Sequence, residues 1–139
     1  MLKIENISLL ESMMAHGEPL HRQISLISET LFFLEDQIRN SDFSSSSLAC
    51  LHDTLRGFSS VFLDLTECLP GLKLTGNAAF VRGAVEKHQN PADITFFIAR
   101  SFDAIRAPMA EPVEPAIDPC LRQALKKILP LLEKIAVEL

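Results

Sequence analysis

The sequence contains no tryptophan and no tyrosine, and only five of its 139 residues are glycine. It has no glycine-rich loop of the kind that cradles phosphate, no HExxH metal motif and no Ser/His/Asp elbow. Acidic residues outnumber basic ones by 18 to 13, and the resulting net charge of −5 disfavours binding to a phosphate backbone or an anionic membrane. We therefore expect no nucleic acid and no membrane among the partners, and no cofactor.

Long hydrophobic runs are also missing. No stretch reaches the roughly 20 apolar residues of a membrane-spanning helix, and Glu5 and Glu11 interrupt the segment where a signal peptide would have its apolar core. The three cysteines, Cys50, Cys68 and Cys120, form no CxxC motif. On one continuous helix the first two would lie about 27 Å apart, beyond the reach of a disulfide. We therefore expect free thiols and a soluble protein in the reducing cytoplasm.

Hydrophobic residues make up 47% of the chain, and they recur with helical rather than strand periodicity. A chain of this length fits one domain. We predict a single all-α domain over residues 1–139, a helical bundle of five to six helices. The helices are expected over residues 4–15, 19–39, 46–69, 77–89 and 91–106, with a last one after Asp118-Pro119. Pro130 should kink this last helix or divide it in two.

Two of these helices carry heptad-like apolar seams, which run from Leu20 to Ile38 and from Leu48 to Leu69. The link between them, NSDFSSSS, is short, and its serines can cap the second helix. We therefore expect the two helices to form an antiparallel hairpin around which the bundle is organised. Four prolines between positions 108 and 119 predict an extended strap at about 107–117.

The segment LHDTLRG resembles the signature of histidine phosphotransfer domains, helical bundles in which a phosphorylatable histidine is followed by a cation and a glycine. The resemblance implies that His52 accepts a phosphoryl group and that Arg56 offsets its charge. On a helix Arg56 lies about 40° from His52, whereas Gly57, which should clear space for the donor domain, is rotated about 140° away. The alternative is that His52 is a half-exposed polar residue beside the packed seam.

A second pattern, RGAVEKH, is similar to the arginine and histidine pair of the HEPN helical ribonucleases. The resemblance implies acid–base chemistry by His88, with Arg82 steadying the scissile phosphate. These side chains would lie about 120° apart on one helix, and the alternative is a histidine that caps the helix end or is partly buried. Glu18 and His21 have the Glu-x-x-His spacing of di-iron bundles, but no second pair accompanies them, so we predict no metal site.

Leu26, Phe32 and Phe33 form a second apolar stripe on the helix at 19–39, roughly opposite its main seam. A helix with two apolar faces lies at the centre of its own bundle or contacts another chain. We therefore hypothesise a non-enzymatic protein-binding module, an adaptor, regulator or chaperone-like protein. It would bind another protein, or a second copy of itself as a homodimer, through this stripe. Phosphotransfer and ribonuclease activity are the alternatives.

Overall fold

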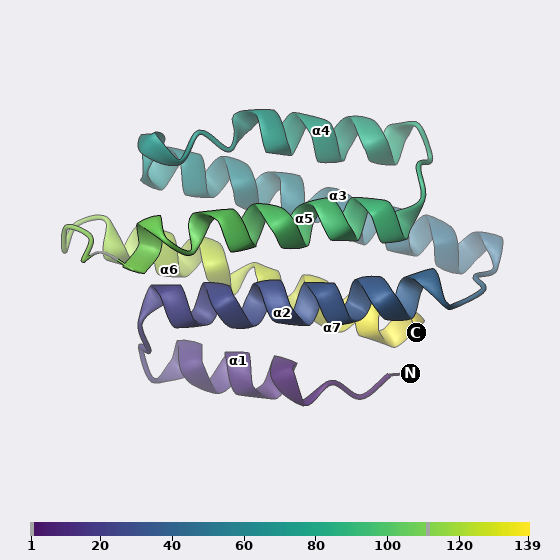
Figure 1. The fold of residues 1–139 in the computed structure, drawn as a ribbon, viewed down its shortest axis with the longest axis horizontal. Helices are drawn as coiled ribbons and strands as arrows, with labels where there is room; N and C mark the ends of the chain where they lie inside the picture. Colours follow the sequence, from purple (N-terminus) through teal and green to yellow (C-terminus); the bar gives the residue numbers. More distant parts are fainter. Residues whose placement is uncertain (1, 111) are drawn as a thin grey trace.

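The computed structural model describes residues 2–110 and 112–139, and every regular element in this part of the chain is helical (Figure 1). The α-helices are α1 (Glu5–Ala15), α2 (Leu20–Arg39), α3 (Ser45–Cys68), α4 (Thr75–Glu86), α5 (Pro91–Ile105), α6 (Asp118–Lys126) and α7 (Ile128–Glu138). Two short 3-10 helices, η1 (Pro70–Leu72) and η2 (Pro108–Ala110), lie in the connections. The all-α prediction is confirmed. Within the same residues, no helix combines the length and the hydropathy needed to cross a membrane.

Side chains at the helix ends fix where two helices begin. Ser44 Oγ accepts a hydrogen bond from the backbone N–H of Ser47 at 3.2 Å, so a serine of the polar link caps α3 as expected. The side chain of Asn90 accepts from the N–H of Ala92 at 2.8 Å, and Pro91 takes the first position of α5. Both caps satisfy amide groups that have no partner inside their own helix.

The C-terminal helical segment is divided, as Pro130 predicts. α6 ends at Lys126 and α7 begins at Ile128, so Pro130 lies in the first turn of α7, where a missing N–H costs little. In one continuous helix the proline ring would clash with the carbonyl of Lys126 and leave that carbonyl without its hydrogen bond. The chain avoids both penalties by breaking the helix at Lys127.

The helices form two layers. In Figure 1, α1, α2, α5 and α4 lie side by side in a front layer, and α3 and the α6–α7 pair lie behind them. The main contacts join α2 to α5, and α3 to α4 and α7. α2 and α3 are therefore consecutive without being each other's main neighbours, and the expected α2–α3 hairpin is not the packing unit. An apolar seam predicts that the apolar face of another helix packs on it, but it does not specify which helix.

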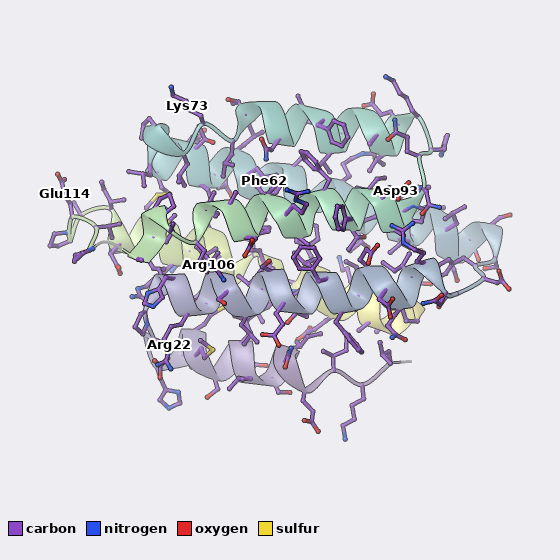
Figure 2. All side chains as sticks on the ribbon, in the orientation of Figure 1. Arg22, Phe62, Lys73, Asp93, Arg106 and Glu114 are labelled. Atoms are coloured by element: carbon purple, nitrogen blue, oxygen red, sulfur yellow. A yellow bond between two sulfur atoms is a disulfide. The ribbon has the colours of Figure 1, made fainter. Side chains whose placement is uncertain are left out.

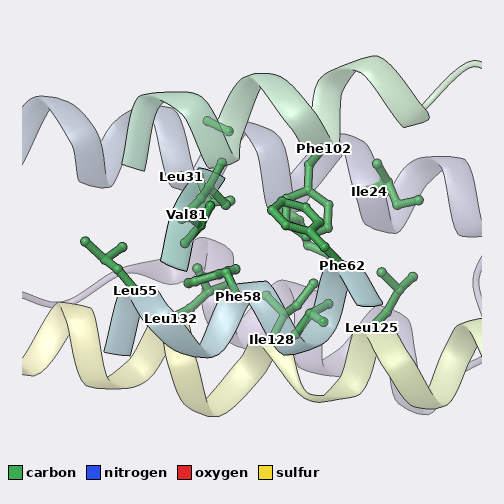
Figure 3. Close-up of a cluster of buried hydrophobic side chains, with 14 of the residues drawn as sticks. Ile24, Leu31, Leu55, Phe58, Phe62, Val81, Phe102, Leu125, Ile128 and Leu132 are labelled. Atoms are coloured by element: carbon green, nitrogen blue, oxygen red, sulfur yellow. The ribbon is translucent and has the colours of Figure 1, made fainter. Parts of the chain in front are cut away.

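Three phenylalanines occupy the centre of the core, where the layers meet (Figure 3). Phe58 and Phe62 extend from α3 toward Phe102 of α5, and all three are fully buried. The ring centroids of Phe62 and Phe102 are 5.2 Å apart, and those of Phe58 and Phe102 are 6.4 Å apart. Packed aromatic pairs of this kind contribute about 0.5–1.5 kcal/mol beyond the burial of their area. Ile128 and Leu132 of α7 close the cluster on the side of the second layer.

The prediction of free thiols is wrong for two of the three cysteines. Cys68, the last residue of α3, forms a disulfide with Cys120 in the first turn of α6, and their Cα atoms are 5.7 Å apart. Cys50 is free and exposed. Helix geometry correctly separates Cys50 from Cys68. The bonded pair is 52 residues apart, and only the return of the chain from α5 to α6 brings it together.

The expected strap at 107–117 is only partly extended. Pro108–Ala110 form η2, and residues 115–117 form a turn that leads into α6. Residue 111 lies outside the described residues. A proline fixes φ near −65°, a value that 3-10 helices and turns share with extended chain. The proline pattern therefore excludes a long α-helix here without selecting an extended conformation.

Candidate functional site

Five of the nine phenylalanines lie on three helices of the front layer, and we call this group the aromatic band. Phe32 and Phe33 come from α2, Phe96 and Phe97 from α5, and Phe80 from α4. The rings of Phe32 and Phe96 meet edge to face with centroids 5.7 Å apart, and those of Phe80 and Phe97 are 4.2 Å apart. The band therefore crosses three helices.

Much of the aromatic band is open to solvent. Phe33, Phe80 and Phe96 are 43%, 48% and 40% exposed, whereas Phe32 and Phe97 are half-buried. α5 lies between α2 and α4 in Figure 1, and its two consecutive phenylalanines point about 100° apart, which lets one ring reach each neighbouring helix. Large apolar side chains exposed together on adjacent helices mark a candidate interaction surface.

Charged side chains border the band. The guanidinium of Arg100 lies 5.9 Å from the centre of the Phe96 ring. Arg39 donates hydrogen bonds to Glu35 at 2.6 Å and to Asp93 at 3.0 Å, and so ties the end of α2 to the start of α5, where Figure 2 labels Asp93. The hydrogen bond that Arg39 donates to Glu35 and, second, the one that it donates to Asp93 raise the pKa of Arg39, so the guanidinium keeps its charge. An apolar centre with a charged border is typical of protein interfaces.

The stripe expected from the sequence coincides with the aromatic band only in part. Phe32 and Phe33 belong to both, but Leu26 is buried, with 8% of its surface exposed, and so does not lie on the open surface. Leu26 lines a cavity of about 470 Å³ whose other lining residues include Arg22 and Arg106, both labelled in Figure 2. α1 packs on α2 and supplies part of the same lining, which explains the burial.

A second candidate site lies between α3 and the end of α4. It is a cavity of about 320 Å³, lined among others by His52, Asp53, Arg56 and His88, and we call it the histidine cavity. His52 is 6% exposed and therefore buried rather than half-exposed as expected. Its Nε2 lies 2.9 Å from the backbone carbonyl oxygen of Gln89, a contact that holds the end of α4 against α3.

The residues that follow His52 are arranged unfavourably for phosphotransfer. Arg56 lines the histidine cavity, but so does Asp53, and the guanidinium of Arg56 pairs with the carboxylate of Asp53 at 3.6 Å. Gly57 faces α7 instead: a Cβ atom at this position would lie 2.6 Å from Leu131 Cδ2. The glycine therefore makes room for α7, not for a donor domain. Phosphotransfer stays a prediction that these positions disfavour.

Arg82 does not line the histidine cavity that His88 borders. Arg82 is exposed on α4, whereas His88 borders the histidine cavity and meets His52 edge to face, with ring centroids 5.8 Å apart. The fold thus pairs two histidines that belong to separate sequence patterns, a contact that no spacing rule predicts. Among residues 2–110 and 112–139, no group of three or more His, Cys, Asp or Glu side chains is arranged to hold a metal ion.

Comparisons with known proteins add no constraint. No family model matches the chain, and no curated protein or solved structure shows significant similarity to it. The inferences about function below therefore start from the aromatic band and the histidine cavity.

Proposed function

We propose that this protein is a non-enzymatic protein-binding module whose docking surface is the aromatic band. The observation that carries the proposal is the exposure of Phe33, Phe80 and Phe96 on three adjacent helices. Apolar surface left in water forgoes about 25 cal/mol per Å² of burial energy, which a partner that covers the rings would recover. Buried aromatic anchors also dominate the energy of many interfaces. The occupant to which we commit is a second copy of the chain.

The outer face of α4 is the reason for choosing a second copy. Gly76, Phe80 and Gly83 follow one another at spacings of four and three residues, so they lie within about 60° of one another around the helix. The ring of Phe80 also packs against Phe97 of α5. A Cβ at either glycine would meet nothing within 4 Å, so the single chain does not require glycine there. Gly83 lies in the interior of α4, where glycine costs about 0.5–1 kcal/mol relative to alanine. Close approach of another backbone would account for that cost.

This face is also self-complementary. With a two-fold axis beside Phe80, antiparallel α4 helices place Gly76 of one copy opposite Gly83 of the other, and the rings lie next to the space that the glycines leave. The same axis sets Glu86 opposite Lys73, which projects outward from the turn before α4 in Figure 2. Large residues beside small ones, and basic residues opposite acidic ones, are what a two-fold interface requires.

Sedimentation equilibrium over a series of protein concentrations tests the proposal. We expect dimers whose fraction rises with protein concentration. Phe80→Asp should weaken the dimer at least tenfold and leave the melting temperature of the monomer nearly unchanged, because the ring is half-exposed. Val137→Asp is the matched control: it places the same charge at an apolar position of α7 that is 56% exposed, and it should dimerise like the wild type.

Gly83→Ala separates association from folding. The added methyl group meets no atom of its own chain, so the monomer should gain about 0.5–1 kcal/mol of stability from better helix propensity. The same methyl group should weaken the dimer because it keeps the two α4 backbones apart. A wild-type chain that stays monomeric at every concentration would overturn the choice of a second copy, as would equal association of wild type and Phe80→Asp.

The adaptor, regulator or chaperone-like role and the cytoplasmic location belong to the same proposal. The bond between Cys68 and Cys120 removes the argument from free thiols, since disulfides persist mainly in oxidising compartments. Alkylation of free thiols in freshly lysed cells decides the location. Modification of both cysteines supports the cytoplasm, and an intact bond supports an oxidising compartment.

A further inference from the structure

The histidine cavity holds a ring nitrogen that the proposed function does not use. A backbone carbonyl can only accept a hydrogen bond, so Nε2 of His52 must carry the proton that it donates to Gln89. In the neutral imidazole the other ring nitrogen, Nδ1, then carries a lone pair. Within the described part of the chain it has no hydrogen-bond partner, and since no unpartnered side-chain nitrogen is buried there, Nδ1 is open to the solvent of the cavity that its ring lines.

This arrangement is the one that metal-binding histidines adopt. Such a histidine almost always donates its second N–H to a backbone carbonyl, a carboxylate or a water, which fixes both the tautomer and the orientation of the ring. For His52 the end of α4 already provides that support. The ring is thus held in one orientation beside the cavity, with Nδ1 as the nitrogen that is left to bind a metal ion.

His88 is held at the same cavity by an unusual backbone conformation. Its φ is 53°, its N–H donates to the carbonyl of Val85 at 3.0 Å, and the N–H of Gln89 donates to that of Ala84 at 3.0 Å. These are the two hydrogen bonds of a Schellman cap, in which glycine usually takes the left-handed position. Residues kept in such conformations cluster at functional sites. The conformation brings the imidazole of His88 to 5.8 Å from that of His52, centroid to centroid.

We propose that the histidine cavity binds a divalent transition-metal ion of the zinc, nickel and copper class, with Nδ1 of His52 and a ring nitrogen of His88 as its protein ligands. Imidazole is a preferred ligand of these ions. With metal–nitrogen bonds of about 2.0–2.1 Å, the centroids of two ligating imidazoles lie about 5.2 Å apart at a tetrahedral angle and about 6.4 Å apart at most. The observed 5.8 Å lies within this range.

The other groups at the cavity define what completes the site. Asp53 and Arg56 both line it, and because their charged atoms pair at 3.6 Å their charges largely cancel there. The described residues offer no arranged set of three metal-ligating side chains, so water completes the coordination sphere and the site is open to solvent. Two protein ligands in an open site predict a moderate affinity, well below that of a closed structural zinc site.

Isothermal titration of the full, disulfide-bonded chain with zinc chloride, in a buffer that does not bind metals, tests the proposal. A Cys50→Ser background removes the free thiol as a competing ligand. This protein should bind one zinc ion per chain. His88→Gly removes one ligand and installs the residue that the left-handed backbone prefers, so it should fold at least as well and bind zinc at least tenfold more weakly. His52→Gln removes Nδ1, keeps a donor for the carbonyl of Gln89, and should weaken binding similarly.

His16→Ala and His21→Ala are the matched controls, because these histidines lie outside the histidine cavity and should leave the zinc affinity unchanged. Thermal melts provide a second measurement. Zinc should raise the melting temperature of the parent protein and leave that of His88→Gly where it is without metal. The absence of saturable zinc binding, equal zinc affinity in His88→Gly, or saturable binding of inorganic phosphate alone would each overturn the proposal.

Discussion

Phenylalanine side chains lie in opposite environments in two regions of this molecule. The core phenylalanines, Phe58, Phe62 and Phe102, are fully buried between the layers, whereas the most open rings of the aromatic band are 40–48% exposed on the front layer. α5 carries both kinds, since Phe102 packs against α3 while Phe96 faces outward. The difference shows that helix propensity and hydrophobicity do not decide burial here. What decides it is whether another helix of the same chain lies opposite the ring.

The largest expected effect separates the core from the band directly. Phe62→Ala removes a ring that is packed on all sides and leaves a cavity, so the free energy of unfolding should fall by about 3–5 kcal/mol. Phe80→Ala removes a half-exposed ring and should cost less than about 1 kcal/mol. Urea denaturation of both variants measures the contrast. Losses of similar size would mean that the aromatic band is part of the core.

The second largest loss of stability is expected on removal of the disulfide that links α3 to α6. Cys68→Ser opens a link between α3 and α6 that spans 52 residues, which should lower the free energy of unfolding by about 2–4 kcal/mol. Hydrogen exchange should accelerate mainly in α6, while the α2–α5 pair that carries most of the aromatic band keeps its protection. Cys50→Ser is the control and should change stability by less than about 0.5 kcal/mol, because that residue is free and exposed. Faster exchange across α2 and α5 would show that the band depends on the disulfide.

A smaller effect tests how the two helices beneath the band are held together. Ser28 Oγ donates a buried hydrogen bond to the carbonyl oxygen of Ala99 at 3.1 Å and so joins α2 to α5. Ser28→Ala should lower the free energy of unfolding by about 1 kcal/mol. Ser25→Ala, on the same helix but only half-buried, should leave it nearly unchanged. Equal losses in both variants would show that helix propensity, not this hydrogen bond, is being measured.

Much of the fold was predictable because it depends on local chemistry. The caps at Ser44 and Asn90 and the break before Pro130 follow from the hydrogen-bonding capacity of one or two residues. The choice of neighbours was not predictable, because the seam of α2 fits α5 as well as it fits α3. The bond between Cys68 and Cys120 depends on that same choice, and so sequence reasoning missed it.

In the candidate sites, too, features set by local sequence were predictable and features set by helix packing were not. Two consecutive aromatic residues point about 100° apart on a helix, so the pairs at 32–33 and 96–97 each favour one ring nearer the surface, and the stripe predicted from the sequence used only the first pair. Phe80 carries no such signal, since its exposure depends on α4 lying at the edge of the bundle. The contact between His52 and His88 depends on how α3 and α4 pack, which periodicity does not encode.

The smallest loss of stability is expected for substitutions of Phe33, and its size tests whether the aromatic band is exposed on α2. Phe33→Asp places a carboxylate where the side chain is 43% exposed, so the charge stays hydrated and no large desolvation penalty arises. Glu29 lies four residues before it on the same helix, and the new repulsion should cost about 0.2–0.5 kcal/mol. We therefore expect a total loss below about 1 kcal/mol and a drop in melting temperature of a few degrees. Phe33→Lys loses the same ring but gains an attraction to Glu29, so thermal melts of the two variants separate the contribution of charge from that of the ring. A loss of about 3–5 kcal/mol in both variants would place Phe33 in the core and leave the aromatic band without an open side on α2.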